Sequence, residues 1–164
     1  MGVYLEDVDE DNGPMMVIAG SHKVGVIDHN SDEYFCGAID PMKTPMAFSQ
    51  AVPLTGAAGT ITLQHVRAVD GSALNRSTKP RRLLLQGYFS ADAWPLNGFR
   101  NRQSIDDFDA LIVRGVSTLE PRLTNIPVKM PFPKALHQGS TYENQQTLKN
   151  RYFESIGPNK RVTK

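Results

Sequence analysis

Glycine and proline divide this sequence into short segments, and this feature most strongly limits the folds it can adopt. The 164 residues include 13 Gly and 11 Pro, which favour short strands and many turns over long helices. A chain of this length is long enough for one domain with a real core. We therefore expect a single, mainly β domain.

Short apolar runs bounded by turn residues predict the strands, which we place within residues 2–8, 15–20, 56–66 and 81–89. Asn12 and Gly13 stand between the first two runs. Both residues tolerate positive φ, so they predict a tight turn that folds these runs into a hairpin. The segment 70–80, between the last two runs, is rich in turn-forming residues and predicts a second turn.

The rest of the chain predicts little regular structure. Residues 21–57 read as a long loop with one short helical turn near 47–52. Ser104, three residues before Asp107, predicts the start of one short helix. Residues 134–164 are mostly polar and predict a C-terminal tail that packs on the domain or stays disordered.

Composition excludes several classes of function. A formal net charge of +1 gives no overall field for nucleic acid. No apolar run approaches the roughly 20 residues needed to span a bilayer, and residues 1–13 are acidic, unlike a signal peptide. The single Cys36 excludes an internal disulfide, suits a reducing compartment and is expected to be buried. We expect a cytoplasmic protein without nucleic-acid or membrane partners.

Two stretches together suggest a family. They are YLEDVDEDNGPMMVIAGSHK at 4–23 and, after a Gly-bounded strand, DGSALNRSTKPRRLLLQGYFSADAWPL at 70–96. In order and spacing they resemble the phytanoyl-CoA dioxygenase family of iron(II)- and 2-oxoglutarate-dependent oxygenases, over about residues 1–96. The resemblance implies Fe(II), 2-oxoglutarate as cosubstrate, and a small-molecule substrate.

The same resemblance implies a fold. We expect the C-terminal part of a double-stranded β-helix, a cupin-like jelly roll with a few short helices. This oxygenase-like domain would occupy residues 1–133 and be incomplete at its N-terminus, with the polar tail at 134–164. In this fold the substrate is set by loops such as 21–57.

Three residues carry the family's site. Arg81 stands where the family places the arginine that holds the distal carboxylate of 2-oxoglutarate. The planar guanidinium group of an arginine suits bidentate pairing with a carboxylate. Ser72 matches a serine that would help to hold the same carboxylate. Asp70 stands where the family has its distal metal-binding His. A carboxylate can still ligate a divalent cation, but it favours harder ions than imidazole does.

The other metal ligands of the family are missing from the sequence. The family's first two ligands come as H-x-D, and this pattern does not occur. Asp28 and His29 have the wrong spacing. We interpret His22 as a hydrogen-bonding turn residue. His65 would leave a regular strand on the face opposite Asp70, and it becomes a candidate ligand only if the chain bends between them.

Three hypotheses stay open. The first is an iron(II)- and 2-oxoglutarate-dependent hydroxylase whose start lies upstream, so that this chain alone would expose strand edges and could self-associate. The second is a non-catalytic jelly-roll remnant that binds a small carboxylate through Arg81 or binds a protein partner. The third and least favoured is a nucleic-acid binder that uses the basic residues between Arg76 and Arg82, because no aromatic residues are interleaved with them.

Overall fold

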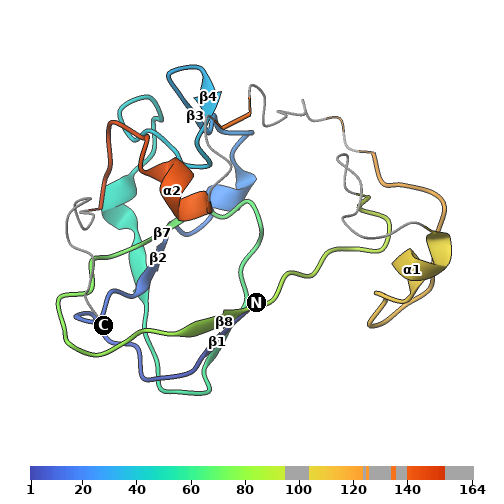
Figure 1. The fold of residues 1–164 in the computed structure, drawn as a ribbon, viewed down its shortest axis with the longest axis horizontal. Coiled ribbons are helices and arrows are strands. Elements are labelled where there is room, and N and C mark those ends of the chain that lie inside the picture. The colour runs from blue at the N-terminus through green and yellow to red at the C-terminus, as the bar shows by residue number, and fades with distance from the viewer. Residues whose placement is uncertain (95–103, 124, 126–133, 136–139, 154–164) are drawn as a thin grey trace. The chain divides into compact units, whose positions relative to one another are not determined.

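A computed structural model describes residues 1–94, 104–123, 125, 134–135 and 140–153. The chain divides into two compact units, one of residues 1–85 with 127–164 and the other of residues 86–126. The described residues form short antiparallel strands and a few short helices (Figure 1). The mainly β class is confirmed, and the jelly-roll arrangement stays a prediction.

The first sheet is built around strand β1. β1 (Gly2–Tyr4) lies between β6 (Ile61–Thr62) and β8 (Leu83–Leu85), and it is antiparallel to both. Tyr4 is only 4% exposed, and its hydroxyl donates a hydrogen bond of 2.7 Å to the carbonyl of Leu54. Because Leu54 belongs to the second sheet, this bond ties the two sheets together.

The second sheet is built around strand β2. β2 (Met15–Val17) lies between β5 (Val52–Leu54) and β7 (Asp70–Ser72), again antiparallel to both. β2 and β8 lie within predicted strands, but β7 falls in a segment for which we predicted a turn. That prediction is wrong for these residues, because pairing with β2 overrides the turn preference of Asp-Gly-Ser.

The predicted hairpin at Asn12 and Gly13 is also wrong. Gly13 does have a positive φ of 76°, as expected. However, β1 and β2 belong to different sheets. The connection between them is held by long-range bridges, which pair Val8 with Gly56 and Asn12 with Asn75. These bridges take the place of a local hairpin ladder.

The 21–57 loop is mostly irregular, as predicted. The segment ends in strand β5, which was not predicted. Its other regular elements are two 3₁₀ turns and one two-stranded hairpin, namely η1 (Ser21–Lys23), β3 (Asn30–Ser31), β4 (Tyr34–Phe35) and η2 (Phe48–Gln50). η2 lies within the predicted helical turn. Cys36 is fully buried, and its thiol donates to the carbonyl of His29 at 3.2 Å, which confirms the expected burial.

Part of the C-terminal segment packs against this loop. Helix α2 (Thr141–Gln145) belongs to the first unit, and the side-chain amide of Gln145 donates to the carbonyl of Gly37 at 3.1 Å. Leu148 is buried. Residues 136–139 and 154–164 of the predicted tail lie outside the described residues.

The second unit contains helix α1 (Ile105–Asp109). The Ser104 side chain accepts a hydrogen bond from the backbone N–H of Asp107, which confirms the predicted helix start. The ring of Trp94 meets that of Phe108 edge-on, with 6.2 Å between the ring centroids. This aromatic contact packs the helix within its own unit.

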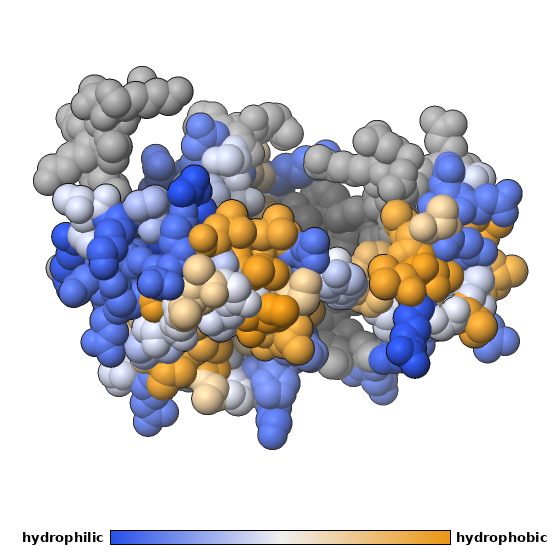
Figure 2. All heavy atoms as spheres, turned by 90° about the horizontal axis from the view of Figure 1, so that it is seen from below, coloured by the Kyte–Doolittle hydropathy of each residue, from blue (hydrophilic) through white to orange (hydrophobic). Residues whose placement is uncertain are grey.

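One face of the first sheet is apolar and exposed. Val3 pairs with Ile61 and with Leu84, so these three side chains share a face opposite to that of Tyr4. Ile61 is 59% exposed, and Leu63, which has the same parity, is 81% exposed. Figure 2 shows an apolar area on the side of the molecule that carries β1 and β8. In the described part of the chain, no helix has the length and apolar character of a membrane span.

Candidate functional site

The structure brings Arg81 and Ser72 together. Arg81 lies on the extended segment before β8, and its Nη2 donates a hydrogen bond to Ser72 Oγ at 3.2 Å. Burial raises the pKa of Tyr4, and the nearby positive charge of Arg81 partly offsets this rise. Since Tyr4 and Ser72 come from different sheets, the Arg81 side chain bridges the region between them.

Asp70 stands at the start of the same strand as Ser72. Its carboxylate has no hydrogen bond and no ion pair with the residues that the structure describes. The side chain is exposed along the strand, yet the surrounding protein displaces enough water to raise the pKa of Asp70. Asp70 therefore offers a carboxylate that has no partner among the described residues, two positions before Ser72 on the same strand.

All three residues line one open pocket in the first unit. The pocket has a volume of about 1130 Å³ and is flanked by apolar side chains of β2 such as Met15. Among the described residues, its charged lining consists of Asp70 and three arginines, Arg67, Arg81 and Arg151. The net charge of these four described side chains is positive, which favours an anionic ligand.

Sequence reasoning missed Arg67 and Arg151 as parts of this lining. Their guanidinium groups are engaged by backbone carbonyls, Arg67 with that of Val24 and Arg151 with that of Gln145. Nothing in the local sequence signals their position, because Arg67 follows β6 and Arg151 follows α2, far apart along the chain. Only the tertiary structure brings them to the pocket.

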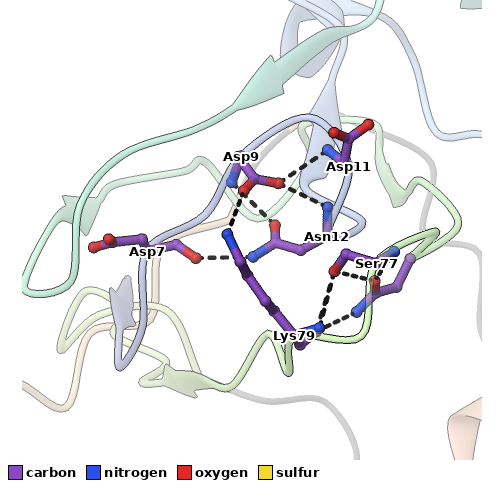
Figure 3. Close-up of polar contacts among 7 residues, drawn as sticks. Asp7, Asp9, Asp11, Asn12, Ser77 and Lys79 are labelled. Carbon is purple, nitrogen blue, oxygen red and sulfur yellow. Dashed lines mark hydrogen bonds and ion pairs between the residues drawn. The ribbon is translucent and has the colours of Figure 1, made fainter.

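A polar network holds the turn that precedes the site arginine (Figure 3). The side-chain oxygen of Asn75 accepts hydrogen bonds from both the N–H and the hydroxyl of Ser77, and its amide donates to the carbonyl of Lys79 at 2.8 Å. The Lys79 ammonium lies 3.6 Å from the Asp9 carboxylate. Hydrogen bonds from backbone N–H groups, first that of Asn12, lower the pKa of Asp9, and Lys79 adds to this effect. The network thus fixes the chain just upstream of the site.

Three histidines belong to the described residues, namely His22, His29 and His65. His22 sits in η1, as predicted for a turn residue, and its ring centroid is 5.2 Å from that of His65. Neither residue lines the pocket. His29 does line it, but its Nδ1 is hydrogen-bonded to the carbonyl of Ile27 at 2.9 Å. Within the described ranges, no three His, Cys, Asp or Glu side chains stand close enough to hold a metal ion.

Comparison with known proteins identifies the class of protein. The chain matches the model of the phytanoyl-CoA dioxygenase family over residues 1–83, which is more than half of its 164 residues. The chain belongs to this family. It is also 40% identical over 157 residues to a protein of Stutzerimonas stutzeri described as a probable alpha-ketoglutarate-dependent hypophosphite dioxygenase.

That alignment covers 93% of this chain but 54% of the relative, so the chain spans about half of the relative's length. No solved structure matches the chain. Family membership and the relative imply Fe(II) and 2-oxoglutarate, another name for alpha-ketoglutarate, as cofactor and cosubstrate. The described residues do not by themselves fit iron, because Asp70 is the one pocket carboxylate and no further ligands gather around it.

Proposed function

We propose that this protein is a 2-oxoglutarate-dependent dioxygenase in which Arg81 and Ser72 hold the distal carboxylate of the cosubstrate. The observation that carries the proposal is the hydrogen bond from Arg81 Nη2 to Ser72 Oγ at the wall of a large open pocket. A guanidinium with a neighbouring hydroxyl can bind both oxygens of a carboxylate.

Hypophosphite, named for the relative, is the first substrate to assay. It is a small oxyanion, and a pocket lined by three arginines and one aspartate attracts anions. Arg67 and Arg151 add positive charge to the lining beyond the residue proposed to hold 2-oxoglutarate. The proposal therefore assigns the pocket two anionic ligands, a dicarboxylate and a small oxyanion.

Calorimetric titration tests the carboxylate site directly. The change is Arg81→Ala, and the matched control is Arg82→Ala, whose side chain pairs with Glu6 instead of Ser72. A hydrogen bond to a charged group contributes about 1.5–3 kcal/mol, so the loss of Arg81 should weaken 2-oxoglutarate binding by about ten- to a hundredfold. The control variant should bind as the parent does. Equal weakening in both variants, or in neither, would remove Arg81 from the site.

A second candidate function is a non-catalytic protein that binds a small carboxylate. Asp70 favours this reading, because it replaces the metal-binding His of the family and stands without a metal-ligating cluster among the described residues. The two candidates separate in one assay, the release of succinate from 2-oxoglutarate with iron(II) and hypophosphite. Turnover supports the dioxygenase, whereas Arg81-dependent binding without turnover supports the carboxylate binder.

A further inference from the structure

The C-terminal segment 140–153 contributes one wall of the pocket. Residues near both ends of this segment line it. The side-chain amide of Asn150 donates a hydrogen bond of 3.0 Å to the carboxylate of Asp40, which is only 8% exposed. A hydrogen bond to a charged acceptor is among the stronger ones in proteins. The segment is thus anchored to the 21–57 loop.

A chain of aromatic rings leads from this loop to the strand β7. The ring of Phe48 stacks on that of Tyr152 with 5.5 Å between the centroids, and Tyr152 meets Phe153 edge-on at 5.1 Å. A Cβ built on Gly71 would lie 3.0 Å from two ring carbons of Phe153. Gly71 has no positive φ, so its backbone conformation does not itself require glycine. Glycine at the middle of β7 therefore makes room for the ring of Phe153.

The ring of Phe153 lies behind the residue that meets the site arginine. Successive side chains of a strand point to opposite faces, so Ser72 points away from the face of Gly71 that meets Phe153. On this other face, Arg81 Nη2 donates to Ser72 Oγ at 3.2 Å. Among the described strands, β7 pairs with β2 alone and lies at the edge of its sheet. Packing of Phe153 on its back therefore limits how far this edge strand can shift.

We propose that Phe153 is a positioning residue of the carboxylate site, which packs on the back of β7 and holds Ser72 in place beside Arg81. The inference rests on the proposed function, because it concerns the same Arg81–Ser72 pair. Two groups that share one ligand must keep a fixed spacing, and small displacements of either group weaken binding. Phe153 acts through Ser72 and needs no contact with the ligand.

Calorimetric titration with 2-oxoglutarate tests the role of Phe153. Phe153→Ala should weaken binding by about three- to thirtyfold, within the range of coupling between neighbouring residues. The matched control is Lys149→Ala on the same segment, which removes an exposed ion pair with Asp32 outside the pocket lining and should bind as the parent does. Urea denaturation of each variant gives its stability separately. A purely structural role would lower the free energy of unfolding and leave the affinity of the folded protein unchanged.

A double-mutant cycle with Gly71→Ala tests the contact itself. The added methyl group would displace the ring of Phe153, so Gly71→Ala alone should weaken binding by at least about threefold. In the Phe153→Ala background the ring is absent, so Gly71→Ala should change the affinity by less than about twofold. If Phe153→Ala does not fold, Phe153→Leu, which keeps an apolar side chain but lacks the ring, takes its place in the cycle.

The outcomes separate this inference from the proposed function. An unchanged affinity without the ring, or an equal effect of Gly71→Ala in both backgrounds, overturns the positioning role of Phe153. In that case weaker binding by Arg81→Ala still supports the carboxylate site. Failure of Arg81→Ala to weaken binding, or failure of the parent protein to bind 2-oxoglutarate, overturns the carboxylate site and the inference together.

Discussion

Asn12 holds the connection between the two sheets, and its replacement by Ala tests how much its buried hydrogen bonds stabilise the fold. The side chain is fully buried. Its oxygen accepts a hydrogen bond of 3.0 Å from the N–H of Asp9, and its amide donates one of 2.8 Å to the carbonyl of Asp7. Asn12→Ala removes both bonds and leaves two backbone groups without these partners.

The expected cost follows from these two bonds. Each contributes a net stabilisation of about 1 kcal/mol, and a buried group left unpaired costs about 1–3 kcal/mol. Because Asp7 is exposed and Asp9 only half-buried, water recovers part of this loss. We therefore expect Asn12→Ala to reduce the free energy of unfolding by about 2–4 kcal/mol. This corresponds to a fall in the urea midpoint of about 1–2 M.

Urea denaturation followed by circular dichroism measures the effect. Asn75→Ala is the comparison, since its side-chain bonds to Ser77 and Lys79 are exposed and water can replace them. We expect Asn75→Ala to cost less than about 1 kcal/mol. An equal loss of unfolding free energy in the two variants would contradict this prediction, because burial would then not determine how much these hydrogen bonds stabilise the fold.

Three further predictions concern charge, backbone strain and association. The raised pKa of Asp70 means that folding favours its protonated form, so this contribution to stability is present below pH 3.8, the usual carboxyl value, and is lost as the pH rises through the folded pKa. Asp70→Asn should therefore raise the thermal midpoint of unfolding at pH 7 and leave it unchanged at pH 3. Glu10→Gln is the control. An equal rise in the thermal midpoint at both pH values would contradict this prediction. Gly13→Ala should lower the free energy of unfolding, measured by urea denaturation, by more than about 2 kcal/mol, because its Cβ would lie 2.8 Å from backbone atoms and its φ is +76°. Gly59 has a φ of +85° but open space around it, so Gly59→Ala tests the backbone strain alone. A second copy of the chain should cover the apolar face of the β1 sheet, so sedimentation velocity should show self-association that Leu63→Lys reduces; a monomeric parent protein would refute this.

The strands that the sequence predicts correctly are those whose signal is local. Leu83–Leu85 and Met15–Val17 are apolar runs bounded by turn residues, and they form strands as expected. Asp70–Ser72 forms a strand only because β2 pairs with it, and a short Asp-Gly-Ser segment carries no local sign of that partner. The hairpin prediction failed for the same reason, since Asn12 pairs with Asn75 far along the chain.

The residues of the candidate site also fall into two groups, those that a sequence motif indicates and those that only the tertiary structure brings to the pocket. The family resemblance selected Asp70, Ser72 and Arg81, and the structure places all three along one pocket. Their roles as metal or cosubstrate ligands stay predictions. Arg67 and Arg151 reach the same pocket from distant segments, so no motif could have selected them. Sequence can indicate a site through a compact motif, but it cannot supply the charges that folding brings to it.

We propose above that Arg81 and Ser72 bind a carboxylate at strand β7. The most direct measurement is a titration of ¹⁵N-labelled protein with 2-oxoglutarate, followed by the backbone amide signals. We expect the largest shifts at Asp70–Ser72 and at Arg81, and we expect Arg81→Ala to abolish them. Shifts centred on another part of the chain, or shifts that persist in Arg81→Ala, would contradict it.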